Sequence, residues 1–125
     1  MNPEKEKELF EKYKELFVYK DNMQASLMGF GFAVGDGWSH IVELCCETIK
    51  SKVDSHNERY DIYHTRVKGT ENEKHWITHP ESKVDYPQVE QVKEKFGGLR
   101  FYIGGCSSEI FDSVRGALDF AESIS

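Results

Sequence analysis

The sequence predicts an α+β fold in which a small antiparallel sheet with a C-terminal hairpin packs against about three helices. Two observations lead to this prediction. Apolar residues recur at helical spacing in three separate segments. Near the C-terminus, apolar and polar residues alternate as in strands on both sides of a glycine pair that suits a turn. A length of 125 residues suits a single domain, residues 1–125, built around one core.

The first helix is expected over residues 3–18. Pro3 suits the first turn of a helix, and the glutamates that follow lie near the positive end of the helix dipole. Apolar residues recur at helical spacing along one stripe, formed by Leu9, Phe10, Tyr13, Leu16 and Phe17. The charged residues between them are expected to form a solvated outer face.

A glycine-rich segment, residues 26–37, precedes the second helix. Phe30, Phe32 and Val34 alternate within it, which indicates a short strand. Asp36 is expected to cap the helix that follows, which runs to about residue 55. The apolar face of that helix consists of Trp38, Ile41, Val42, Cys45, Ile49 and Val53.

Residues 54–86 show no clean period. They hold four of the five histidines and many charges, and they are compatible with a continued helix or with a strand. The part around residues 69–73 is expected to be a loop. Pro80 and Pro87 interrupt whatever regular structure surrounds them.

Residues 89–103 are expected to form two strands joined by a two-residue turn at Gly97 and Gly98. Because side chains alternate between the two faces of a strand, one face of this hairpin is apolar. That face collects Val92, Phe96, Leu99, Phe101 and Ile103, with Glu94 as its one charged residue. A three-residue loop would change the parity and remove this pattern.

A final helix is expected to follow the next two glycines, capped by Ser107 or Ser108. Its apolar stripe consists of Ile110, Phe111, Val114, Ala117, Leu118, Ala121 and Ile124.

The second face of the hairpin gathers Gln91, Lys93, Lys95, Arg100 and Tyr102. In the expected register Lys93 lies opposite Tyr102, and Lys95 lies opposite Arg100. This like-charge pair costs about 0.2–1 kcal/mol. One interpretation is an ordinary hydrated sheet face, with its cations neutralised by acids such as Glu90 or those of the first helix.

The other interpretation is a binding site for a small anion. Arginine offers a planar fork to phosphate oxygens, lysine supplies a point charge, and Tyr102 can stack on a base. The formal net charge of the whole chain is −6, which argues against binding to DNA or RNA polymers. A local site for a phosphate compound is compatible with that charge.

Trp38 belongs to a second candidate feature, the sequence Gly35-Asp36-Gly37-Trp38 at a helix start. Backbone N–H groups at such a position can hold a phosphate, although Asp36 places a negative charge there. Trp38 is therefore either a core residue beside a capping turn or the wall of a pocket that receives a base.

No catalytic, metal-binding or cofactor-binding motif is found in the sequence. His75 and His79 lack an accompanying metal-ligand pattern, and no serine or cysteine lies in a nucleophile motif. The three cysteines, with Cys45 and Cys46 adjacent, predict reduced thiols in a cytosolic compartment. Because the chain starts with charged residues, no signal peptide is expected. Because it has no run of ~20 apolar residues, no membrane span is expected.

Two motifs resemble a large set of small phage-encoded proteins. They are Gly31-Phe32-Ala33-Val34-Gly35-Asp36-Gly37-Trp38 and Gln91-Val92-Lys93-Glu94-Lys95-Phe96-Gly97-Gly98-Leu99-Arg100-Phe101-Tyr102. With the flanking helices the resemblance covers about half of the chain and leaves out residues 54–86. This set is similar to a phage anti-CBASS family that sequesters the cyclic oligonucleotides of bacterial antiphage signalling without cleaving them.

The resemblance implies a non-enzymatic sponge for a cyclic dinucleotide such as 3′3′-cGAMP, acting in the cytoplasm of an infected bacterium as a homo-oligomer, with a tetramer expected. Lys93, Lys95, Arg100 and Tyr102 become phosphate- or base-contacting candidates, and Trp38 a base-stacking one. Two alternatives stay open. The chain is a protein-binding inhibitor or accessory factor with an acidic surface, or a phosphoesterase that uses His64, His75 or His79.

Overall fold

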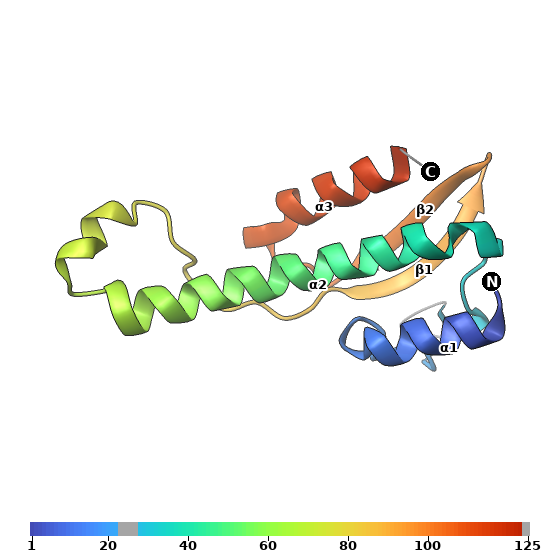
Figure 1. Ribbon diagram of the computed structural model, residues 1–125, viewed down its shortest axis with the longest axis horizontal. Coiled ribbons are helices and arrows are strands. Elements are labelled where there is room, and N and C mark those ends of the chain that lie inside the picture. Colours follow the sequence, from blue (N-terminus) through green and yellow to red (C-terminus); the bar gives the residue numbers. More distant parts are fainter. Residues whose placement is uncertain (23–27, 124–125) are drawn as a thin grey trace.

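A computed structural model describes residues 1–22 and 28–123 and confirms the α+β class. Within these residues the regular elements are α1 (Pro3–Lys12), α2 (Ser39–Ile62), β1 (Gln88–Lys95), β2 (Gly98–Gly104) and α3 (Ser108–Ser123). The two strands pair antiparallel. Figure 1 shows α2 running along the molecule and crossing the hairpin, with α1 on one side and α3 on the other.

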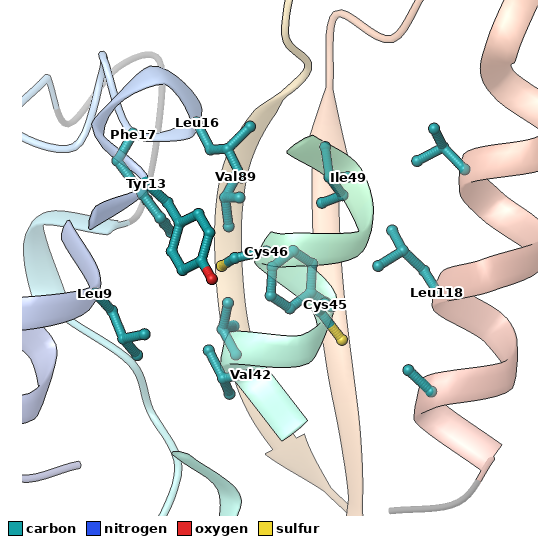
Figure 2. Close-up of a cluster of buried hydrophobic side chains, with 14 of the residues drawn as sticks. Leu9, Tyr13, Leu16, Phe17, Val42, Cys45, Cys46, Ile49, Val89 and Leu118 are labelled. Carbon is teal, nitrogen blue, oxygen red and sulfur yellow. The ribbon is translucent and has the colours of Figure 1, made fainter. Parts of the chain in front are cut away.

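The core lies between α2 and the elements around it. Its buried side chains on α2 are Val42, Cys45, Cys46, Ile49 and Val53. In Figure 2 the Cys46 side chain points toward α1 and the Cys45 side chain toward α3. Leu118 of α3 and Val89 of β1 belong to the same buried cluster. Burial of this apolar surface is the main favourable contribution to folding.

Burial also determines the chemistry of the cysteines. It raises the pKa of the Cys45 thiol to about 12 and holds the pKa of the Cys46 thiol well above its usual value. Both thiols are therefore protonated and inaccessible at neutral pH, whereas Cys106 is partly exposed. Thiol titration of the native chain is expected to detect Cys106 alone, and titration in denaturant all three cysteines. Reaction of two or more thiols in the native state would contradict this packing.

The predicted helix boundaries are partly wrong. α1 ends at Lys12 because the backbone of Tyr13, at φ −118°, leaves the helical region, and a 3₁₀ turn over Lys14–Leu16 follows. The stripe predicted for the first helix is nevertheless buried or half-buried throughout. α2 continues to residue 62 rather than 55 and passes into a π-helical turn, Tyr63–Val67. No glycine or proline interrupts the chain between α2 and Gly69.

The predicted cap of the second helix is also wrong. Asp36 begins a 3₁₀ turn, Asp36–Trp38, and the N-cap of α2 is Trp38, which makes no side-chain cap. The Asp36 carboxylate instead accepts a hydrogen bond from the Asn2 N–H at 2.5 Å. At α3 the prediction is confirmed, because the Ser107 hydroxyl accepts the Glu109 N–H at 3.3 Å.

The apolar stripe predicted for the last helix is mostly confirmed. Ile110, Val114, Leu118 and Ala121 are buried and Ala117 is half-buried, whereas Phe111 is exposed. Ile124 lies outside the described residues.

The segment between α1 and α2 forms less of a strand than predicted. Met28–Phe30 is a 3₁₀ turn, and Ala33 makes one parallel bridge to Lys93 on the free side of β1. The Ala33 N–H bonds to the Val92 carbonyl at 2.9 Å, and the Ala33 carbonyl accepts the Glu94 N–H at 3.1 Å. The alternation is confirmed where it can be followed, since Phe32 and Val34 are both buried.

The turn of the hairpin differs from the prediction by one residue. Lys95 pairs with Gly98, so the two turn residues are Phe96 and Gly97 rather than Gly97 and Gly98. Their φ angles are +53° and +78°, as a type I′ turn requires. Phe96 is consequently absent from the core face, where it was expected, and its side chain is 95% exposed at the tip.

The register moves by two residues, and an even shift leaves every strand residue on its predicted face. Val92 now lies opposite Phe101, and both are buried. Glu94 lies opposite Leu99 instead of Phe101. Its carboxylate reaches the Gly35 N–H at 2.8 Å. This register gives Phe101 an apolar partner and gives the one charged residue of the core face a hydrogen bond.

The outer edge of β2 is covered by side chains of α3. The Glu122 carboxylate accepts the Phe101 N–H at 3.1 Å, and the Arg115 guanidinium donates to the Phe101 carbonyl at 3.5 Å. Arg115 also bonds to Glu122 at 3.0 Å. An exposed edge would leave these backbone groups available to another strand.

Candidate anion-binding face of the hairpin

The candidate site is the open face of the hairpin, which we call the cation face: Gln91, Lys93, Lys95, Arg100 and Tyr102. The observed register confirms that these residues share one face, opposite to buried Val92, Leu99 and Phe101. Lys93 and Arg100 are half-buried, and Lys95 and Tyr102 are exposed. The strand pairing therefore brings four of the five predicted site residues together.

Lys93 and Arg100 lie directly opposite each other across the hairpin, not Lys95 and Arg100 as expected. The backbones of Val92 and Glu94 bond outward to Ala33, so the backbone of Lys93 is directed toward Arg100. Cβ atoms of such a pair are about 5.5 Å apart, and two like charges in this position destabilise the sheet. The backbone of the hairpin thus places two cationic side chains opposite each other, with the Arg100 guanidinium extending over Gly98 and the Lys93 ammonium toward Tyr102.

None of these cations has a carboxylate partner in the described part of the chain. Among the residues that the structure describes, no ion pair within 4.0 Å includes Lys93, Lys95 or Arg100. The Arg100 guanidinium donates to the carbonyl of Leu99 at 3.0 Å.

Two acids of the predicted first helix, expected as one source of neutralisation, pair with other lysines. Lys5 lies 3.8 Å from Glu8, and the carboxylate of Glu15, just beyond α1, lies 3.6 Å from Lys50. Glu43 on α2 lies 3.0 Å from Lys12. The cation face therefore retains three positive charges that no carboxylate of the described chain neutralises at ion-pair distance.

Two aromatic rings lie beside these cations. The Lys93 ammonium is 5.6 Å from the centre of the Tyr102 ring, and the Lys95 ammonium is 5.7 Å from the centre of the Phe96 ring. Both distances are in the range of a cation–π contact. Sequence analysis missed Phe96 because the glycine pair was taken as the turn. No local signal pointed to Phe96, because the first position of a type I′ turn favours Asn, Asp or Gly.

Trp38 is not brought to this face. It is half-buried at the start of α2 and packs against the core cluster, which lies on the opposite face of the hairpin. Within residues 1–22 and 28–123, no ring contact or hydrogen bond joins Trp38 to the hairpin cations. Its position fits the core interpretation.

Three of the five histidines, His64, His75 and His79, lie beyond the end of α2, in a lobe that Figure 1 shows beyond the rest of the molecule. The Tyr63 ring stacks on His79 at 3.7 Å and meets His64 edge-on at 5.1 Å. His75 is exposed. In the described part of the chain, no group of three or more His, Cys, Asp or Glu side chains could hold a metal ion. These contacts favour a packing role for His64 and His79.

Comparisons with protein-family models, with curated proteins and with solved structures gave no match to this chain. Over the residues described, no helix is both long enough and apolar enough to cross a bilayer.

Proposed function

We propose that this protein binds a cyclic dinucleotide on the cation face and sequesters it without cleaving it. The observation that supports the proposal is a set of three cations to which no carboxylate of the described residues comes within ion-pair distance, beside exposed Tyr102, on an otherwise acidic chain. The class of ligand comes from the resemblance of the two sequence motifs to phage sponges of antiphage messengers.

The chemistry of the face suits such a ligand. Opposed cations at Lys93 and Arg100 lose their mutual repulsion when a phosphate lies between them. Arg100 can offer two parallel N–H groups to the phosphate oxygens, and Tyr102 offers a ring to a base. Binding would lower the concentration of free messenger in an infected bacterium, so that its effector is not activated.

A sponge needs slow release, which favours a ligand covered on both sides. The cation face is an open sheet surface, so a second copy of the chain is the proposed cover. This is the basis on which we propose a homo-oligomer.

The direct test is incubation with a panel of cyclic dinucleotides, followed by removal of free ligand, heat denaturation and chromatography. We expect intact nucleotide to be released from the denatured protein. Fragments would instead indicate a phosphoesterase. Retention of no nucleotide would reject the proposal and favour a protein-binding inhibitor.

The site itself is tested by Lys93→Ala and Arg100→Ala. Each is expected to weaken nucleotide binding by about 10- to 100-fold, the equivalent of one lost charge-assisted hydrogen bond, and to reduce its dependence on salt. Matched controls are Lys52→Ala and Arg66→Ala, two exposed positions that remove the same charges outside the hairpin. Equal nucleotide affinities of the site variants and the control variants would show that the cation face does not bind the nucleotide.

A further inference from the structure

We infer that Phe96 is a second base-stacking residue, so that the hairpin presents two aromatic–lysine pairs to a ligand with two bases. The inference rests on the proposed function and adds to it a residue at the tip of the hairpin, outside the cation face as the strand register defines it. Three observations lead to it: the backbone conformation of Phe96, its exposure, and its position relative to the cations.

The backbone conformation of Phe96 is unfavourable for its side chain. Its φ of +53° lies in the left-handed region, which glycine and asparagine adopt more readily than a bulky residue does. The first position of a type I′ turn favours Asn, Asp or Gly. The hairpin would therefore form more easily with another residue here, and the turn does not explain the phenylalanine.

Packing does not explain the phenylalanine either. The side chain is 95% exposed, which is more than any other large apolar residue reported for the described chain. Figure 1 shows the tip of the hairpin at the end of the molecule away from the histidine lobe. An aromatic ring that is strained and solvated at a projecting turn contributes nothing evident to the fold.

The position of the ring matches the rest of the site. Lys95 and Lys93 lie two residues apart on one face of β1, about 7 Å along the strand. Each has an aromatic ring at nearly the same distance, 5.7 Å for Phe96 and 5.6 Å for Tyr102. The Arg100 guanidinium lies over Gly98, 3.4 Å from where a Cβ would be. Along the hairpin the order is thus ring, cations, ring.

A ligand with two bases joined through phosphates has the complementary order. Aromatic side chains bind bases by stacking with little dependence on base identity, and neighbouring cations hold the backbone phosphates. Phe96 and Tyr102 therefore supply one ring for each base, and the three cations supply the charge between them. Trp38, the base-stacking candidate of the sequence, is replaced in this role by Phe96.

The test is Phe96→Asn, with Phe96→Tyr as the conservative control. Asparagine suits the positive φ, so the melting temperature of the variant is expected to be equal to or above that of the parent chain. Its affinity for the cyclic dinucleotide is expected to fall about 5- to 100-fold, which corresponds to the loss of one stacked base. Phe96→Tyr is expected to retain the parent affinity.

Inorganic pyrophosphate, which has charge but no base, separates stacking from electrostatics. Its affinity is expected to be the same for the parent chain and for Phe96→Asn. A matching loss of pyrophosphate affinity would overturn the inference, because Phe96 would then act by positioning the lysines.

Unchanged dinucleotide affinity in Phe96→Asn, combined with a loss in Lys93→Ala, would overturn this inference and leave the proposed function standing. Absence of any nucleotide binding by the parent chain would reject both.

Discussion

Replacement of Phe101 by alanine is expected to lower the free energy of unfolding by about 3–5 kcal/mol. The ring is 1% exposed, lies opposite buried Val92 in the hairpin and belongs to the core cluster. Alanine would leave a cavity that close-packed neighbours fill only in part. Urea unfolding followed by circular dichroism measures the loss, as a lower midpoint with an unchanged slope.

Tyr102→Ala is the matched control, because Tyr102 is the next residue of the same strand and points to the opposite face. Its ring is 39% exposed, so the expected loss of stability is below about 1 kcal/mol. The same variant is expected to weaken nucleotide binding. Comparable losses of stability from both substitutions would contradict the assignment of faces.

Lys93→Glu is expected to abolish nucleotide binding and at the same time to stabilise the hairpin. The substitution replaces a like-charge pair opposite Arg100 by an opposite-charge pair, a gain of about 0.2–1 kcal/mol. The ligand phosphate loses one charge-assisted hydrogen bond and meets a carboxylate instead, which predicts a loss of affinity beyond about 100-fold. Isothermal titration calorimetry and thermal unfolding measure the two effects separately.

Lys52→Glu provides the control, since it makes the same change of charge at an exposed position on α2. It is expected to leave affinity within about twofold, because exposed charges beyond a Debye length are screened. A Lys93→Glu variant that still binds the nucleotide as tightly as Lys52→Glu would show that the cations serve another purpose.

The sequence predicted which faces of the elements are buried better than it predicted where the elements end. Helical spacing and strand alternation depend on many residues, so single errors do not change them. The residue at which a helix begins or ends depends on a few hydrogen bonds, which contacts with distant parts of the chain can change. The Asp36 side chain is suited to an N-cap, but in the folded chain its carboxylate accepts a hydrogen bond from the N–H of Asn2, which is distant in sequence. The length of α2 likewise depended on the lobe that packs around Tyr63.

The candidate site shows the same division. Alternation placed Lys93, Arg100 and Tyr102 on one face, and the structure confirms this because the register error was even. The identity of the turn could not be derived locally, since local preference favours Gly97-Gly98 over Phe96-Gly97 in a type I′ turn. In the observed register buried Phe101 lies opposite Val92 rather than Glu94, a difference in packing that no local turn pattern contains.

The sealing of β2 by α3 bears on how copies of this chain can associate. The outward backbone groups of Phe101 bond to Arg115 and Glu122. On the other side of the hairpin, Ala33 pairs with the outer edge of β1. At these positions an incoming strand would first have to displace a side chain or a chain segment. At these positions the fold thus disfavours edge-to-edge pairing with the strand of another copy.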